Sequence, residues 1–446
     1  MKLKHIAICV VCAIVLCGIL IAPKAWNAIY GEQDIVGPVG VIPVQTAVLS
    51  PPAQGPADWP CWRGLSGDGK STVTGIAKDF SGLKKLWEVD YLCQGRQSAT
   101  WSAPAVRGNR LIVPGRSSSE DLIFCLDPNN GELLWLGSYK ARAGRSHGPG
   151  PRATPYIDDD RVYTFGRSGD LACWNLNDGK LLWKRNVNDA GGETPKWGHS
   201  SSPLVYGDKV LVQGGGSARA LAYEKMTGEV VWKAGKGDAG YAAPAIVNMG
   251  DKVGLLIFHG TGLACLDPDG GNEFWSVPWK TSYNVNATTP VSSDGIVLIT
   301  SGYGTGCQAL KVGDAGADVL WRSKVIAAHH SDPFIIDGFI YGYSGQSNQN
   351  KGHFKCVKLD DGTEKWSTDK LGWGTTLYVD GHLLCMDNKG NLFLVKPDRE
   401  ALLLVTQLNN ALGDIDHPAW TIPVVANGKL YLRYMQRLIC YSLASE

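Results

Sequence analysis

The sequence predicts an all-β fold, an eight-bladed β-propeller of four-stranded blades. A Gly followed four residues later by a Trp recurs in five copies, first at Gly131 and Trp135 and last at Gly362 and Trp366. A looser copy ends at Trp321, and successive Trp residues lie about 43 to 49 residues apart. That period is typical of a propeller blade with four strands.

Each repeat contains the chemistry of a β-hairpin and one large aromatic side chain. The Gly follows Asp, Asn or Thr in most copies, and Gly supplies the positive φ that tight hairpin turns require. The Trp opens the next strand and is too large to cover within one small sheet, so we expect it to pack against the neighbouring blade. The docking residues predicted in this way are Trp87, Trp135, Trp183, Trp232, Trp275, Trp321 and Trp366.

A second phrase marks where each blade begins: a small residue and Pro, followed by alternating apolar residues. Alternation indicates a half-buried strand, and Pro is tolerated at its first residue. Eight openings are found, at Pro104, Pro155, Pro203, Pro244, Pro290, Pro333, Thr375 and Pro423. The last has room for only three strands, so Leu83–Asp90, which carries Trp87, is predicted to be its fourth strand and to close the ring. Seven blades is the alternative, because the unit near Gly374 is short and ends in Leu402–Leu404 without a Trp.

Composition agrees with a propeller and excludes one class of partner. The 446 residues include 55 Gly and 16 Trp, with 44% hydrophobic and 19% charged residues, as expected for a ring of small sheets with many tight turns. Lys and Arg number 43 against 42 Asp and Glu, and no basic stripe is present. Nucleic acid is therefore not expected as a partner.

The N-terminus predicts a membrane anchor. Ile6–Ala22 is an uncharged apolar run of 17 residues that follows Lys2 and Lys4, and no small-residue cleavage site comes after it. The lysines place the N-terminus in the cytoplasm and the rest of the chain across the inner membrane, in the periplasm or another extracytoplasmic space. A cleaved signal peptide and a lipid anchor are the alternatives. The predicted domains are 1–30 (membrane anchor or signal), 31–57 (linker) and 58–446 (propeller).

The twelve cysteines do not form a disulfide framework by their spacing. Five occupy one place in the repeat, just before the turn, and are expected to be small buried apolar residues: Cys125, Cys173, Cys265, Cys356 and Cys440. Cys61 and Cys93 are the one pair considered for a disulfide in an exported protein. No Cys or His spacing typical of a metal site occurs.

Three longer phrases carry a resemblance to a known family: DWPCWRGLSGDG at 58–69, WGHSSSPLV at 197–205 and TIPVVANGKLYLR at 421–433. With the turn-and-Trp repeat, they make the chain similar to the pyrroloquinoline quinone (PQQ)-like propeller family, which includes the outer-membrane assembly factor BamB. The resemblance implies a non-catalytic scaffold that binds envelope proteins or peptides and needs no cofactor. A PQQ- and calcium-dependent alcohol or sugar dehydrogenase is one alternative, although the adjacent Cys-Cys pair of such enzymes is missing. A propeller that binds a small ligand without turnover is the other.

The loops that precede the first strand of each blade hold the candidate binding residues. In a propeller these loops converge on the central channel, so their side chains are expected to form one binding site at its mouth. No catalytic residue is assigned. Adjacent histidines point to opposite sides of a strand, which disfavours the pair at 329–330 as metal ligands. For any one histidine, capping of a nearby turn is the alternative. The candidates are Arg145, His147, Trp197, His199, Asn284, Asn286, His329, His330, Asp332, Trp373, His417 and Trp420.

Overall fold

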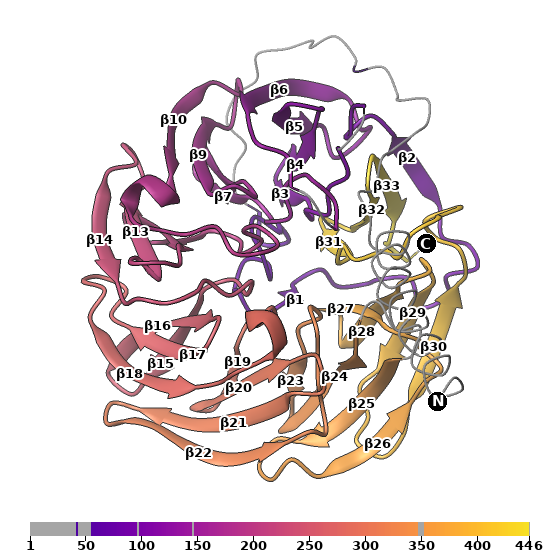
Figure 1. The fold of residues 1–446 in the computed structure, drawn as a ribbon. Helices are drawn as coiled ribbons and strands as arrows, with labels where there is room; N and C mark the ends of the chain where they lie inside the picture. The colour runs from indigo at the N-terminus through magenta and orange to yellow at the C-terminus, as the bar shows by residue number, and fades with distance from the viewer. Residues whose placement is uncertain (1–41, 43–54, 96–97, 145–146, 347–351, 446) are drawn as a thin grey trace, which may run out of the picture.

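The chain folds into eight sheets around a central axis, each with four antiparallel strands, and one of them carries a short parallel fifth strand (Figure 1). The computed structural model describes residue 42 and residues 55–95, 98–144, 147–346 and 352–445. Blades 1 to 4 consist of β3 (Ala105–Arg107), β4 (Arg110–Arg116), β5 (Glu120–Leu126) and β6 (Leu133–Lys140); β7 (Tyr156–Asp158), β8 (Arg161–Phe165), β9 (Asp170–Asn175) and β10 (Leu181–Asn186); β11 (Leu204–Tyr206), β12 (Lys209–Gln213), β13 (Ala220–Glu224) and β14 (Val230–Ala234); and β15 (Ala245–Met249), β16 (Lys252–His259), β17 (Gly262–Leu266) and β18 (Glu273–Pro278).

Blades 5 to 8 complete the ring. They consist of β19 (Val291–Ser293), β20 (Ile296–Ser301), β21 (Gly306–Gly313) and β22 (Gly316–Ser323); β23 (Phe334–Ile336), β24 (Phe339–Gly345), β25 (Gly352–Lys358) and β26 (Glu364–Thr368); β27 (Gly374–Val379), β28 (His382–Asp387), β29 (Leu392–Lys396) and β30 (Leu403–Leu408); and β31 (Val424–Ala426), β32 (Lys429–Tyr434), β33 (Arg437–Ser442) and β2 (Lys85–Val89). A short strand, β1 (Lys70–Ser71), and two 3-10 turns, η1 (Val187–Ala190) and η2 (Ser282–Asn284), lie outside the repeat.

The N-terminal strand closes the ring, as predicted. Strand β2 pairs antiparallel with β33, and Trp87 lies opposite Cys440. Every blade is thereby a complete four-stranded sheet, the seventh included, so the alternative of seven blades is wrong.

The tryptophans dock on the turn of the neighbouring blade. Trp135 donates its Nε1–H to the carbonyl of Leu176 at 2.8 Å, and its ring lies on Gly179. A Cβ at Gly179 would be 2.5 Å from that ring, which explains the Gly in this part of the repeat. Five further Trp residues donate to a carbonyl of the next blade in the same way: Trp87, Trp183, Trp232, Trp321 and Trp366.

Trp275 is the exception among the predicted docking residues. Its Nε1 lies 3.4 Å from Sδ of Met249 in its own blade. The next blade carries the loose copy of the repeat, in which β21 and β22 stay paired as far as Gly313 and Gly316. That longer hairpin replaces the short turn on which the other six indoles rest, a turn that contains the Gly in five of the six cases.

Small residues lie directly across the sheet from the docking tryptophans. Each of the five repeat cysteines faces a Trp, as Cys125 faces Trp135, and Ala222 and Ala309 hold this place in two other blades. A small side chain leaves room for the indole in a close-packed interior. All nine cysteines within the described residues are free and buried. Cys61 and Cys93 therefore form no disulfide; Cys61 instead lies with Sγ 3.1 Å from the carbonyl of Gly64.

Blade 7 replaces the missing Trp by a residue from elsewhere in the chain. Thr406 holds the Trp place, opposite Leu394, and its Oγ1 accepts a hydrogen bond from the backbone N–H of Phe80 at 3.0 Å. Phe80 is completely buried in the core shared by blades 7, 8 and 1. An aromatic side chain from the N-terminal segment thus seals blade 7.

The segment before Phe80 crosses the middle of the ring. Trp59 pairs with Val106 beside β3, and the carbonyl of Pro60 accepts from the backbone of Ile157 in β7. On the opposite side, β1 pairs in parallel with β27. In Figure 1 this segment is the indigo trace at the centre of the ring. It belongs to the folded propeller and connects blades that are far apart in sequence.

The predicted anchor at 1–30 and nearly all of the linker at 31–57 lie outside the described residues. Within the part of the chain that is described, no helix has both the length and the apolar character needed to span a bilayer.

Candidate functional site

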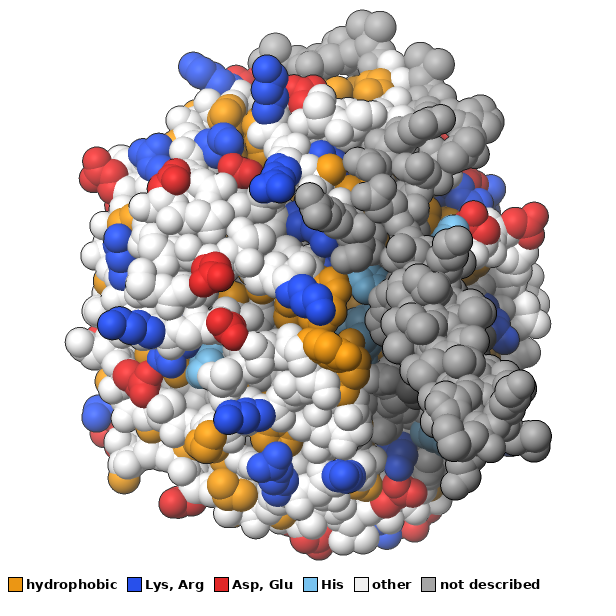
Figure 2. Space-filling model, viewed as in Figure 1, with side chains coloured by type: hydrophobic (Ala, Val, Ile, Leu, Met, Phe, Trp, Pro, Cys, Tyr) orange, Lys and Arg blue, Asp and Glu red, His pale blue; other side chains and the backbone are white. Residues whose placement is uncertain are grey.

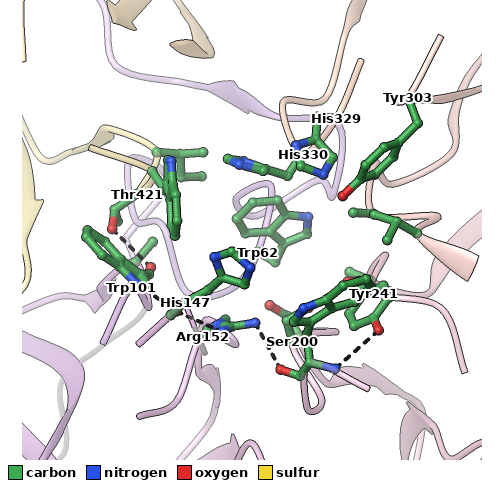
Figure 3. Close-up of a pocket in the computed structure, with 18 residues that line it drawn as sticks. Trp62, Trp101, His147, Arg152, Ser200, Tyr241, Tyr303, His329, His330 and Thr421 are labelled. Carbon is green, nitrogen blue, oxygen red and sulfur yellow. Dashed lines mark hydrogen bonds between the residues drawn. The ribbon is translucent and has the colours of Figure 1, made fainter. Parts of the chain in front are cut away.

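A cavity of about 230 Å³ lies at the centre of the ring, among the loops that precede the first strands. Every blade except the seventh contributes to its wall, and Trp62 contributes from the N-terminal segment. Figure 3 shows these side chains pointing toward one another from different parts of the chain. The lining residues are Trp62, Trp101, Ala103, His147, Arg152, Trp197, Ser200, Ser202, Tyr241, Ala243, Val285, Ala287, Tyr303, His329, His330, Trp420, Thr421 and Ile422.

Seven rings form a closed circuit of contacts, which we call the aromatic collar; six of them line the cavity and the seventh, Tyr283, lies outside its wall. Neighbouring ring centroids are 4.9 to 6.5 Å apart, within the range of favourable aromatic pairs. Trp373 supports the collar from blade 7, with its ring 4.7 Å from that of His330. In order around the circuit, the collar consists of Trp420, His147, Trp197, Tyr283, Tyr303, His329 and His330.

Three collar residues have a backbone conformation that bulky side chains rarely adopt. His147, Tyr283 and Tyr303 have φ values of 55°, 61° and 56°. Left-handed backbone in a non-Gly residue costs about 1–3 kcal/mol and persists where the surroundings enforce it, often at binding sites. The collar geometry is therefore held against a local backbone preference. That strain is a structural reason to regard the collar as functional.

The cavity is electropositive. Arg152 is the charged residue in the wall, and no Asp or Glu among the described residues lines the cavity. Arg152 donates from Nη1 to the carbonyl of Trp197 at 3.0 Å and from Nη2 to that of His147 at 2.8 Å. Burial, and then the nearby guanidinium of Arg167, lowers the pKa of Arg152 well below its usual value. Because Arg152 places a positive charge in the wall and no carboxylate of the described lining offsets it, the cavity disfavours cationic guests.

The collar imidazoles are neutral near pH 7. Burial, and then the positive charges of Arg152 and Arg167, lower the pKa of His147 to about 4. The pKa of His329 is also lowered to about 4, first by burial, and that of His330 lies well below its usual value for the same reason. Neutral imidazoles among indoles and phenols give the mouth a mainly apolar, weakly polar surface. Figure 2 shows histidine and hydrophobic side chains together at the middle of this face.

Five of the predicted candidates line the cavity: His147, Trp197, His329, His330 and Trp420. Trp373 lies just behind, packed on His330.

Asn284 and Asn286 contribute structure near the cavity without lining it. The amide of Asn284 donates to Asp238 at 2.5 Å. Asn286 is fully buried, donates to the carbonyl of His259 at 2.7 Å and accepts from Ser301 at 2.8 Å. Both amides are therefore occupied in holding neighbouring loops together.

Three predicted residues are elsewhere, and one is not described. His199 is buried between blades, with its ring 4.9 Å from that of Phe165. His417 lies in a separate polar groove, with Nδ1 2.9 Å from Asp416. Asp332 is buried in an ion pair with Arg63. Arg145 lies outside the described residues.

Several lining residues did not emerge from the repeat pattern. Arg152 lies in the same loop as the predicted His147 and could have been found by extending the search through that loop. Tyr241 lies in the loop before β15, which supplied no candidate. Tyr303 lies between β20 and β21, in a loop that the pattern does not mark. Trp62 belongs to the phrase at 58–69, whose cluster of aromatic residues and glycines was the available signal.

A family comparison identifies the fold family. Residues 119–368, more than half of the chain, match the model of the family described as outer membrane protein assembly factor BamB. The chain belongs to the BamB family. No curated protein matches the sequence.

Solved structures place this BamB-family chain among propellers of differing activity. BamB from Moraxella catarrhalis aligns with a TM-score of 0.58 and 14% identity, covering 82% of this chain and 99% of that one. The quinohemoprotein alcohol dehydrogenase from Comamonas testosteroni aligns with a TM-score of 0.61 and 12% identity, covering 87% and 81%. The corresponding dehydrogenase ADHIIG from Pseudomonas putida HK5 gives 0.60 and 10%, covering 88% and 81%. At these identities the likeness concerns the fold, which hosts both kinds of protein.

Proposed function

We propose that this protein is a non-catalytic binding propeller, anchored by Ile6–Ala22 on the extracytoplasmic side of a membrane, and that its collar holds an apolar or aromatic side chain of a partner protein or peptide. The observation that carries the proposal is the closed circuit of seven rings, six of which line one cavity. Aromatic surface with a few polar groups is the usual composition of a hot-spot pocket.

The size of the cavity favours part of a ligand over a whole small molecule. Pockets for drug-sized ligands measure roughly 300–1,000 Å³, whereas this one is about 230 Å³. One large side chain fits that space, with the surrounding loops left to contact the rest of a peptide.

The chemistry of the wall is a poor match to the alternative dehydrogenase. Calcium takes six to eight oxygen ligands, mainly carboxylates and carbonyls, and no carboxylate of the described residues lines this cavity. Within the same residues, no group of three His, Cys, Asp or Glu side chains is placed to hold a metal ion. The wall residues therefore do not fit a PQQ–calcium pair.

The proposal is tested with capped tripeptides, acetyl-Gly-X-Gly-amide, in which X is Trp, Leu or Lys. We expect ligand-observed NMR to show saturable binding in the order Trp, Leu and then Lys, because the cavity is apolar and electropositive. The double variant Trp197→Ala/Trp420→Ala should lose at least tenfold in affinity for the Trp peptide.

A matched control keeps this test specific. The double variant Phe274→Ala/Leu404→Ala removes exposed apolar side chains from outer strands and should bind like wild type. Equal loss in both double variants, or no selectivity among the peptides, would contradict the proposal. Turnover of alcohols or aldoses with added PQQ, calcium and an artificial electron acceptor, eliminated by one substitution such as His330→Ala, would establish the dehydrogenase instead.

A further inference from the structure

Residues 55–73 occupy the inside of the ring, although the sequence pattern assigns the start of this stretch to a linker. The indole of Trp62 donates to Oγ1 of Thr289, a residue 227 positions later, at 2.8 Å. Further along, the hydroxyl of Ser71 donates to the carbonyl of Val425 in β31 at 3.0 Å. These contacts are made to the innermost parts of blades 5 and 8.

A buried ion pair fixes the segment at its midpoint. Nη1 of Arg63 lies 2.9 Å from Asp332, and both side chains are 7% exposed. The other oxygen of Asp332 accepts the backbone N–H of Thr289 at 2.8 Å, so the carboxylate connects blade 6, blade 5 and the segment. Arg63 also donates to the carbonyls of Gly67 and Asp68, at 3.1 and 2.7 Å, which shapes the segment around its own guanidinium. Loss of one partner of such a pair strongly destabilises the fold, because the other charge is left buried without a counter-charge.

Trp62 lies next to this ion pair and is part of the cavity wall. Figure 3 shows its indole at the centre of the view, surrounded by collar and wall residues from several blades. The ring of Trp62 cannot turn away from the cavity without breaking its hydrogen bond to Thr289, and the contacts of Arg63 fix the adjoining residue of the chain.

We propose that residues 55–73 are a plug that closes one end of the central channel, and that Trp62 is the floor of the cavity and limits the size of the side chain that the collar accepts. The second part rests on the proposed function, since it requires a guest in the cavity. Trp62 is in this view a specificity residue supplied by the segment that joins the propeller to its predicted anchor.

The size limit is tested by making the side chain at position 62 smaller and the central side chain of the bound peptide larger. The probes are acetyl-Gly-Trp-Gly-amide and the same peptide with the longer 4-phenyl-phenylalanine at its centre. Wild type should prefer the Trp peptide, and Trp62→Ala should reverse the preference, changing the affinity ratio at least tenfold. Trp62→Phe, which keeps a ring at the floor, should retain the wild-type preference. An unchanged ratio in Trp62→Ala would refute the role of Trp62 as floor.

The plug itself is tested without a ligand, by hydrogen exchange of the full-length protein read by mass spectrometry. We expect the amides of 55–73 to exchange far more slowly than those of an unstructured peptide, and Arg63→Ala to speed their exchange while the strands of blade 3 keep wild-type protection. Exchange of 55–73 at the unstructured rate in wild type would overturn the plug. If no peptide binds wild type or variant, the proposed function and the selectivity of Trp62 both fail, and hydrogen exchange alone decides whether the segment is a plug.

Discussion

The junction between blades 8 and 1, where the ring closes, can be tested by a pair of matched glycine substitutions. Gly131 and Gly428 have nearly equal φ values of 76° and 72°. An Ala in left-handed backbone costs about 1–2 kcal/mol, so this part of the cost should be the same at both sites. The sites differ in what the new methyl group meets.

At Gly131 a Cβ would lie 2.8 Å from Cε3 of Trp87, whereas at Gly428 it would meet no heavy atom within 4 Å. Overpacking of this kind adds about 1–3 kcal/mol. We therefore expect Gly131→Ala to lower the free energy of unfolding by about 2–5 kcal/mol, and Gly428→Ala by about 1–2 kcal/mol. The measurement is urea-induced unfolding monitored by circular dichroism, in which the dependence of the unfolding free energy on urea concentration is compared across the variants.

Trp87→Ala completes the cycle. Trp87 is 8% exposed and donates to the carbonyl of Pro128 at 3.1 Å, so its truncation should cost about 3–5 kcal/mol. In that background the extra cost of Gly131→Ala should disappear, leaving a value like that of Gly428→Ala. Leu86→Ala, which alters an exposed neighbour in the same strand, should change stability by less than about 0.5 kcal/mol. Equal costs for the two glycine variants in the wild-type background would refute the argument that the indole locks the ring at Gly131.

Three further outcomes follow from buried polar groups. Burial lowers the pKa of His199 to about 3, so between about pH 6.5 and pH 3 the unfolded chain binds a proton that the native state does not bind. The free energy of unfolding should therefore fall as the pH drops from about 6.5 toward 3. His199→Phe should reduce this pH dependence, as urea titrations at each pH would show. Asp332→Ala should lower the free energy of unfolding by about 3–5 kcal/mol, and Arg63→Met/Asp332→Leu should cost less than this single change, as unfolding midpoints would show. Burial raises the pKa of Cys61 to about 12 and of Cys93 to about 11, so neither thiol should react with Ellman's reagent in the native protein. Both should be alkylated after unfolding without reductant. A peptide containing a disulfide between them would contradict this.

The repeat made the blade number and ring closure predictable. A Trp with a Gly four residues before it is a local pattern, and its period gives the spacing of the blades. Trp87 could be assigned to the last blade because that blade otherwise had three strands, and β2 is found there. In blade 7, where the repeat lacks its Trp, the prediction missed the contact that replaces it. Nothing in the local sequence shows that Phe80 serves blade 7 in place of a Trp, because Phe80 and Thr406 are far apart in sequence and meet only in the folded chain.

The site was predictable by loop but not by side chain. The loops before the first strands do converge on one cavity, yet His199 turns toward Phe165 and His417 toward Asp416 while His330 enters the cavity wall. Which way each ring points depends on the length and backbone of its own loop, and no period governs these. The plug was missed for a related reason, since Arg63 and Asp332 are 269 positions apart and belong to no repeat.

The pairing of β2 with β33 has a consequence for the order of folding. A hairpin within a blade joins neighbouring residues, whereas Trp87 and Cys440 are separated by roughly 350 residues of chain. Closing a loop of that length instead of one of about ten residues costs about 3 kcal/mol more in chain entropy, since each doubling adds about 0.6 kcal/mol. We therefore expect the last blade to be completed after the other seven, as the slowest contact of the ring to form. During that interval β2 lacks its strand partner, and the backbone groups that will pair with β33 stay unpaired until the final residues of the chain arrive.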